Sequence, residues 1–336
     1  MAESDTQSPD HLAVPFISRA RPELLYSVEH FYPTHPDHPL ATLTAEHHGY
    51  FRQEGIGKVS LGIAGDDTGS IDYLVDGTTH FSIDAHPLMV MQANAEGKDL
   101  YIVGSYRNGL PFTIFGRKGL HSVCDLKGKR LGIIRIMGVA HRTFLLVLPK
   151  FGIDPEKDVE LVDAGETFEK MENMRKGFID ATIYHHDAEG PLVERHIESG
   201  EFVKIADLSE MFPDFVTRAM ATSGKMIREK PQVVKGFVKA VIRATQYMHD
   251  EDPMGKGAVE LARKALGVDS MVGSRLHGGR PAPWPLTGKD VMASAAGLAV
   301  HIQEARLRRQ LPDWFRVENV LRNEFVEEAL RELGLR

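Results

Sequence analysis

Cysteine is almost absent from this sequence, which has one residue of that kind, Cys124, among 336. A single cysteine cannot form an internal disulfide, and it cannot supply a zinc site built from several thiolates. Long runs of one charge are also missing, and the net charge is −7. The sequence therefore excludes a disulfide scaffold and predicts neither a nucleic-acid surface nor a polybasic membrane anchor.

Long apolar runs are lacking as well. No stretch approaches the ~18 consecutive apolar residues that span a bilayer. Residues 1–11 are polar and acidic, without the basic start and apolar run of a secretory signal. We therefore expect no membrane insertion and a cytoplasmic protein, or a periplasmic or lipid-anchored one if an export signal has been removed from this sequence.

What the sequence does contain is an ordinary globular composition, with 42% hydrophobic and 26% charged residues. The length is enough for two lobes of roughly 100 to 200 residues, each with its own core. Short β-rich runs alternate with stretches of helical spacing through the first two thirds of the chain, which predicts two α/β sheets. The predicted strands lie at residues 24–28, 59–63, 80–83, 100–103, 111–115, 130–134, 159–162 and 181–184.

After residues 215–220 the pattern becomes almost wholly helical. Pro231 opens a predicted helix that runs to about Asp250, with apolar residues recurring on one face. Further helices are predicted at about 258–266, 290–307 and 318–333. The chain is therefore expected to end in a helical C-terminal extension.

Five short motifs occur in order along the chain. They are HGYFRQEGI at 48–56, DG at 76–77, SVCDLKGKRLG at 122–132, GIDPEKDV at 152–159 and KGFIDA at 176–181. In this order and spacing they resemble the motifs of the NMT1/THI5-like branch of the type 2 periplasmic-binding-protein fold. The resemblance covers most of the chain from Pro22 to Asp252.

The resemblance implies a two-lobed α/β fold with a two-strand hinge and a small ligand held between the lobes. By chain order, the crossing strands are expected at about Phe112–Arg117 and Phe215–Ala221. The expected units are a flexible segment at 1–21, lobe 1 at 22–116 and 215–336, and lobe 2 at 117–214.

Candidate site residues in lobe 1 follow from the rule that ligands bind at the carboxyl ends of strands and the N-termini of the next helices. Imidazole transfers protons near neutral pH, so His35 and His86 are candidate acid/base residues, with Asp84 to orient the His86 ring. The other substrate-binding candidates of this lobe are Phe31, His38, Tyr106, Arg107 and Arg218.

In lobe 2, the turn after the strand at 130–134 is the preferred anion site. Arg135 can hold a carboxylate bidentately there, and Gly138 permits close backbone approach. Tyr184, His185 and His186 end the last parallel strand and complete the set. Because adjacent residues of a strand point to opposite faces, one of the two histidines is expected to reach the ligand, and His186 is the catalytic candidate.

These side chains suit a small organic anion, and the aromatic rings among them favour an aromatic one. The sixteen histidines raise the question of a metal, but no HExxH or similar compact signature occurs. We therefore expect no metal and no other cofactor. A homodimer remains open.

Relatives implied by the resemblance include receptors of ABC importers and a minority of cytoplasmic enzymes. Pyrimidine-precursor synthases use a cysteine-rich run where residues 218–222 have none, and aryl sulfinate desulfinases use a cysteine after the first strand, which is also missing. Lyases similar to 4,5-dihydroxyphthalate decarboxylase remain. We therefore lean towards a cofactor-free decarboxylase of aromatic compound catabolism, with arginines holding a carboxylate and a histidine moving a proton. The alternative is a solute-binding protein that carries a small organic anion to an ABC permease.

Overall fold

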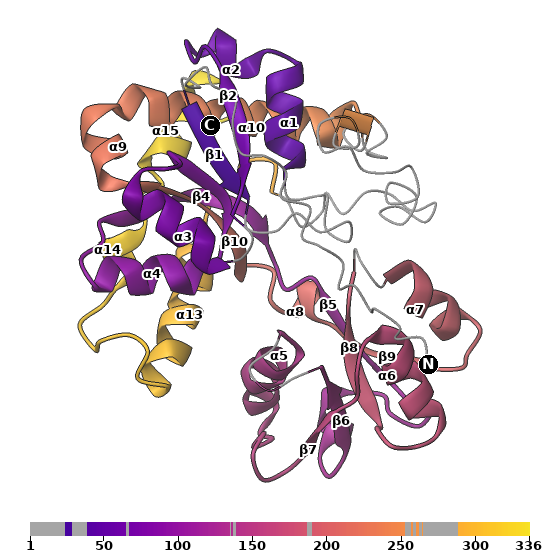
Figure 1. The fold of residues 1–336 in the computed structure, drawn as a ribbon. Coiled ribbons are helices and arrows are strands. Elements are labelled where there is room, and N and C mark those ends of the chain that lie inside the picture. The colour runs from indigo at the N-terminus through magenta and orange to yellow at the C-terminus, as the bar shows by residue number, and fades with distance from the viewer. Residues whose placement is uncertain are drawn as a thin grey trace, which may run out of the picture.

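The computed structural model has two α/β lobes joined by two passages of the chain (Figure 1). Of the predicted elements, segment 1–21 lies outside the described residues, and so does most of the helix expected at 258–266. The structure describes residues 24–28, 39–64, 67–134, 136, 139–186, 190–252, 257, 260, 261, 264 and 288–336.

Lobe 1 is built on a five-stranded sheet in the order β2-β1-β3-β10-β4. β1 runs parallel to β2 and β3, whereas β10 is antiparallel to both of its neighbours, β3 and β4. The strands in sheet order span Val59–Ile63, Leu24–Val28, Phe81–Ala85, Val216–Ser223 and Leu100–Asn108.

Lobe 2 repeats this arrangement with the order β7-β6-β8-β5-β9. β6 runs parallel to β7 and β8, and β5 is antiparallel to β8 and β9. The strands in sheet order span Glu160–Asp163, Arg130–Ile133, Ala181–His185, Phe112–Gly116 and Val203–Asp207. The fourth strand of each sheet is therefore the antiparallel one, and each follows a passage of the chain between the lobes.

The two passages lie side by side at residues 109–111 and 212–215, where the backbone N–H of Gly109 donates to the carbonyl of Phe215 over 2.7 Å. The sequence placed the outward crossing within Phe112–Arg117. Strand pairing puts it earlier, because β5 is hydrogen-bonded along its length to β8 and β9 and so belongs to the sheet of lobe 2. The boundary between the lobes, predicted at 116/117, therefore lies earlier in the chain, at residues 109–111.

Helices cover both faces of each sheet. In lobe 1, α1, α2, α9, α10 and α15 pack on one face, and α3, α4, α13 and α14 on the other. They span Leu40–His47 (α1), Tyr50–Gln53 (α2), Asp67–Asp76 (α3), Pro87–Ala95 (α4), Gly224–Glu229 (α9), Pro231–Asp250 (α10), Ala295–Leu307 (α13), Val317–Val320 (α14) and Glu324–Glu332 (α15).

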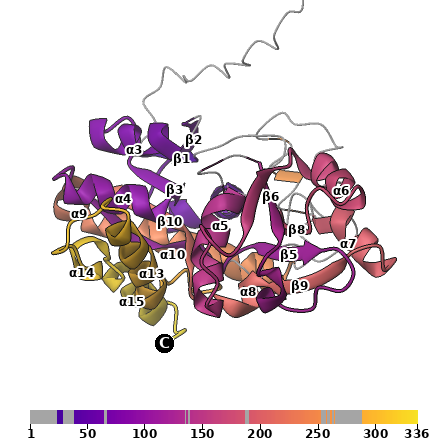
Figure 2. The same ribbon diagram turned by 90° about the horizontal axis from the view of Figure 1, so that it is seen from below.

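In lobe 2, one face carries η1, α5, η2 and α8, and the other carries α6 and α7. Their bounds are Val123–Leu126 (η1), Val139–Val147 (α5), Leu148–Phe151 (η2), Thr167–Arg175 (α6), Gly190–Glu198 (α7) and Leu208–Met211 (α8). α13 of lobe 1 lies beside α5 (Figure 2), and its Val300 packs against the lobe 2 core. Within the described ranges, no helix combines the length and apolar character needed to cross a membrane.

The C-terminal helices are shorter than the sequence predicts. The helix expected from residue 290 begins at Ala295, because Val291 has a left-handed φ of 49° and its carbonyl accepts the N–H of Ser105 in β4 over 2.7 Å. The helix expected at 318–333 is divided into α14 and α15, since Leu321 forms a bridge to Ile102 of the same strand. The predicted bounds of α10, by contrast, are confirmed.

Phe237 of α10 is the centre of the lobe 1 core. Its ring is fully buried and stacks on Phe81 at 4.0 Å and on Phe51 at 5.2 Å between centroids. These contacts join α10 to the sheet and to α2, so the long helix is fixed by apolar burial on one face.

Replacing Phe237 with alanine is expected to lower the free energy of unfolding by about 3–5 kcal/mol, because it leaves a cavity among these rings. Urea unfolding followed by circular dichroism measures the change. The matched control is Phe178→Ala, since that ring is 59% exposed and its removal should cost within about 0.5 kcal/mol. Equal losses at the two positions would contradict this account of the core.

Candidate functional site

The carboxyl ends of the parallel strands in both sheets face the passages between the lobes. In lobe 2, His185 at the end of β8 pairs with Phe112, the first residue of β5 after the outward passage. In lobe 1, Ala85 at the end of β3 pairs with Ala219, near the start of β10 after the return passage. The predicted site residues therefore come from two sheet edges that meet at one junction.

Two arginines, Arg107 and Arg218, lie on the lobe 1 side close to the backbone of Asp84. Arg107 of β4 and Arg218 of β10 are partners across neighbouring strands. Arg107 is only 3% exposed, and an Nη1 atom of half-buried Arg218 donates to the backbone carbonyl of Asp84 over 3.3 Å. The Asp84 side chain is fully buried. Positive charge is thus in excess among these three side chains, an arrangement that favours an anion.

His186 occupies the lobe 2 side of the junction. Its Nε2 lies 2.8 Å from the hydroxyl oxygen of Thr113 and 3.7 Å from a carboxylate oxygen of Asp207. Its backbone N–H donates to the carbonyl of Pro111, in the outward passage, over 2.9 Å. The imidazole therefore lies against side chains of β5 and β9, while the backbone of His186 is hydrogen-bonded to the outward passage.

The electrostatic field at His186 combines charges from both lobes. Burial lowers the pKa of His186, Asp207 acts to raise it, and Lys204 and Arg107 lower it further. The pKa of Asp207 is also low: burial acts to raise it, but a hydrogen bond from Ser209 and the neighbouring cationic groups outweigh burial. His186 is consequently neutral at pH 7, so it can accept a proton or a hydrogen bond.

Two further histidines, His86 and His301, lie near each other next to the return passage. His86 is the N-cap residue of α4, and its ring centroid lies 6.0 Å from that of His301 on α13. Nε2 of His301 is 2.8 Å from the carbonyl of Val216, and its ring packs 4.3 Å from that of Phe215. Full burial lowers the pKa of His301 to about 4, which keeps the ring neutral at pH 7, with Nε2–H as the donor to that carbonyl.

The remaining predicted residues differ in where they lie: one is at the junction, one is in the core of lobe 2, and most are outside the described side chains. The ring of His185 packs edge-on against Phe112 with a centroid distance of 5.0 Å. Tyr184, predicted as a ligand contact, lies instead in the lobe 2 core beside Phe115, where it is 2% exposed and its hydroxyl donates to Glu194. Only the backbone of Tyr106 is described, and the predictions for Phe31, His35, His38, Arg135 and Gly138 lie outside the described residues.

Sequence reasoning did not select Thr113, Asp207 or His301. Asp207 ends β9, so the rule that strand ends line the site could have found it once that strand was assigned to lobe 2. Thr113 and His301 carry no comparable signal, since one lies within a strand and the other on a C-terminal helix. Their roles depend on tertiary contacts.

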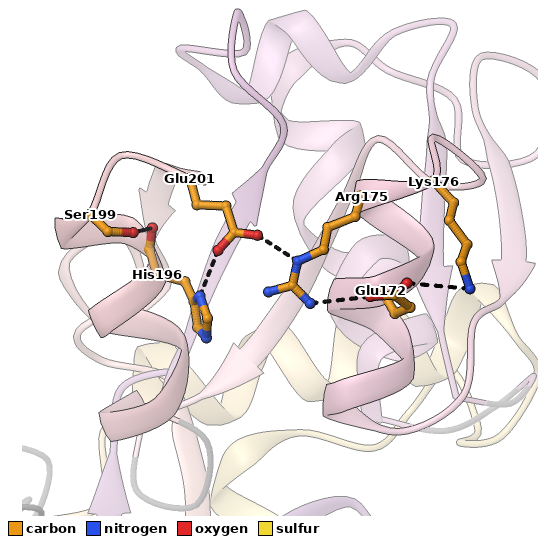
Figure 3. A network of polar contacts seen from close by, with 6 residues as sticks. All are labelled: Glu172, Arg175, Lys176, His196, Ser199 and Glu201. Carbon is orange, nitrogen blue, oxygen red and sulfur yellow. Dashed lines mark hydrogen bonds and ion pairs between the residues drawn. The ribbon is translucent and has the colours of Figure 1, made fainter.

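A separate charged cluster joins the C-terminal ends of α6 and α7 (Figure 3). Glu201 accepts from Nε of Arg175 over 2.5 Å and lies 2.6 Å from Nδ1 of His196, while Glu172 pairs with Arg175 and Lys176. The hydrogen bond from Arg175 is the main cause that lowers the pKa of Glu201. These helices begin at the junction edge, so their far ends lie away from it, and such exposed ion pairs contribute little to stability. Across the described parts of the chain, no three histidine, cysteine or acidic residues are placed to hold a metal ion.

Comparison with known proteins places this geometry in a wider group. The family model described as NMT1/THI5 like matches residues 36–253. None of the curated proteins that were compared matches the sequence.

Solved structures extend the likeness over almost the whole chain. A putative periplasmic sulfonate-binding protein of an ABC transporter from Methylobacillus flagellatus KT has a TM-score of 0.67 at 16% identity and covers 93% of this chain and 95% of its own. The periplasmic nitrate-binding protein NrtA from Synechocystis PCC 6803 has 0.60 at 14%, covering 93% and 89%. The desulfurization enzyme DSZB has 0.58 at 16%, covering 92% and 99%. Identities of this size establish the shared fold alone, and they confirm the predicted two-lobed architecture.

His301 should make stability fall as the solution is acidified. The unfolded chain takes up this proton near pH 6.5 and the folded chain only near pH 4, so the stabilisation is complete above pH 6.5 and is lost between these values. The loss by pH 5 is about 2 kcal/mol, at about 1.4 kcal/mol per pH unit. His301→Gln keeps an N–H donor for Val216 but does not titrate, so urea unfolding at pH 7 and pH 5 should show a smaller decline by that amount. Parallel declines in the two proteins would refute the assignment.

Proposed function

This chain belongs to the NMT1/THI5-like family, and from that premise we propose that it binds a small organic anion between its lobes as the solute-binding component of an ABC importer. The observation that carries the proposal is the pairing of Arg107 with Arg218 on neighbouring strands at the junction. A guanidinium group presents parallel N–H donors that match a carboxylate or a sulfonate, and its burial strengthens the interaction.

The solved structures that resemble this chain support a receptor rather than an enzyme. The sequence alone favours a cytoplasmic decarboxylase over a receptor. However, the relatives named as sulfonate-binding and nitrate-binding proteins are periplasmic, and both named ligands are anions. We therefore propose that the protein works outside the cytoplasmic membrane with an ABC permease as its partner.

Binding would use both lobes. The anionic group contacts Arg107 and Arg218 in lobe 1, and hinge closure brings His186 of lobe 2 to the same ligand. Arg107 already lies close enough to affect the pKa of His186 across the junction. An anion placed between them would attract the Arg107 guanidinium and favour the protonated form of His186, so the ligand would stabilise the closed arrangement.

An enzyme of the same fold is the second candidate, and neutral His186 is the observation that favours it. Its Nε2 is held by Thr113 and Asp207, so the ring is fixed in orientation as a proton-transferring group requires. The relative named as a desulfurization enzyme shows that this architecture also occurs in a catalyst. In this reading the arginines hold a carboxylate while His186 moves a proton.

Arg218→Gln is expected to weaken anion binding by roughly 10- to 100-fold, the equivalent of one lost charged hydrogen bond. Isothermal titration with butanesulfonate and benzoate measures the change. The control is Arg228→Gln, because Arg228 also lies in lobe 1 but is exposed and pairs with Asp99 on the surface. The two variants should unfold at similar temperatures. Equal affinities in both would exclude Arg218 from the binding site.

The two candidate functions make opposite predictions for the fate of a bound compound. A receptor returns an anion such as benzoate or 4,5-dihydroxyphthalate unchanged after prolonged incubation with excess ligand, as judged by proton NMR. A decarboxylase releases carbon dioxide and the decarboxylated ring, and His186→Asn should then lower turnover by at least 100-fold while binding persists. We expect the unchanged ligand. Catalytic turnover that depends on His186 would instead favour the decarboxylase over the receptor.

A further inference from the structure

Large apolar side chains are exposed on lobe 2 where the chain leaves two neighbouring strands. Ile136 and Phe168 are 74% and 71% exposed, and Ile134 is 38% exposed. Among the described residues, Ile136 and Phe168 are two of the three most exposed large apolar side chains. Single exposed apolar residues are common, but several near one another indicate a binding surface.

Sheet topology brings these three residues to the edge that faces the junction. Ile134 directly follows β6, Ile136 comes two residues later, and Phe168 lies in the first turn of α6, after β7. β6 and β7 are parallel neighbours, with Ile133 and Asp163 in register at their ends. Because β6 is also parallel to β8, all three strands end on the side where His186 lies.

The distances along this edge match an organic molecule better than an inorganic ion. Neighbouring strands are about 4.8 Å apart, so the end of β6 lies about 5 Å and that of β7 about 10 Å from the end of β8. An anionic group held by Arg107 and Arg218 beside β8 would leave room for an apolar portion that extends towards Ile136 and Phe168.

Acidic residues near β7 do not supply a second polar subsite. Asp163 accepts the backbone N–H of Gly165 over 3.2 Å, and Glu169 accepts that of Glu166 over 2.7 Å. Glu166 completes the capping box of α6. These carboxylates are engaged in shaping their own loop, and their negative charge disfavours an anionic group at this end. They therefore help to orient the ligand with its charge towards the arginines.

We propose that Ile134, Ile136 and Phe168 form an apolar subsite that selects amphiphilic organic anions, such as alkyl or aryl sulfonates and carboxylates, over inorganic anions. This inference rests on the proposed anion site. The anionic head binds at Arg107 and Arg218, and the hydrocarbon portion is buried against lobe 2 when the lobes close. Discrimination comes from the apolar area that the ligand removes from water.

The test is isothermal titration of the full chain with sulfate, nitrate, benzenesulfonate and the straight-chain methane-, butane- and hexanesulfonates. For the wild type, affinity should rise about fourfold for each methylene buried. In the double variant Ile136→Ser with Phe168→Ser, this rise should largely disappear, while methanesulfonate binding changes less than twofold. Both positions are exposed, so the variant should fold, and its thermal midpoint checks this.

Phe178→Ser is the matched control. This residue is also an exposed phenylalanine of lobe 2, but it precedes β8 and so lies at the opposite edge of the sheet. It should keep the wild-type dependence on chain length.

Three outcomes overturn the subsite. These are an unchanged chain-length dependence in the double variant, sulfate or nitrate binding to the wild type as tightly as hexanesulfonate, and an equal loss for every anion, which would assign the side chains to lobe closure alone. If no probe anion binds the wild type, the proposed anion site fails, and the subsite fails with it.

Discussion

The architecture depends on a pair of chain passages that lie against each other between the lobes. The outward passage leads into β5 and the return passage leads into β10. Each of these strands is the antiparallel one, in the fourth position of the sheet of its lobe. The backbone hydrogen bond from Gly109 to Phe215 holds the passages together. Because the two passages connect the lobes covalently, any relative rotation of the lobes has to occur about these passages. The same constraint turns both carboxyl edges towards one junction.

The junction concentrates positive charge in one lobe and a neutral imidazole in the other. Arg107 and Arg218 are partly or largely removed from water, with Asp84 close by. The charge of Arg107 reaches His186 and, together with burial, opposes the protonation of its ring. The organic anion that we propose as ligand would complement these groups, because it adds negative charge and brings its own apolar surface to a lobe that exposes apolar side chains.

Local patterns in the sequence predicted much of the fold and part of the site. The apolar face of α10 and the strand rhythm follow from spacing alone, and the ordered motifs identified the two-lobed architecture, as confirmed by the family match. Arg107, Arg218 and His186, which the sequence proposed, lie at the junction, and their contact with a ligand stays a prediction. The rule for strand ends misplaced Tyr184, because alternation along β8 turns that ring into the core.

Features that depend on distant parts of the chain were harder to predict. The allegiance of β5 to lobe 2 is set by partners about 70 and 90 residues later, β8 and β9, rather than by its own pattern. The break between α14 and α15 follows from a bridge to β4. His301 gains its buried environment from the return passage, and no local spacing records that contact.

The scarcity of cysteine has a practical consequence for studying motion in this molecule. Cys124, the single thiol, is exposed on η1 of lobe 2. A maleimide dye or a nitroxide attached there would modify one lobe at one known position, without prior removal of other thiols. One engineered cysteine on lobe 1 would then complete a donor–acceptor pair. The native sequence thus already supplies one of the two labelling sites needed to measure the distance between the lobes.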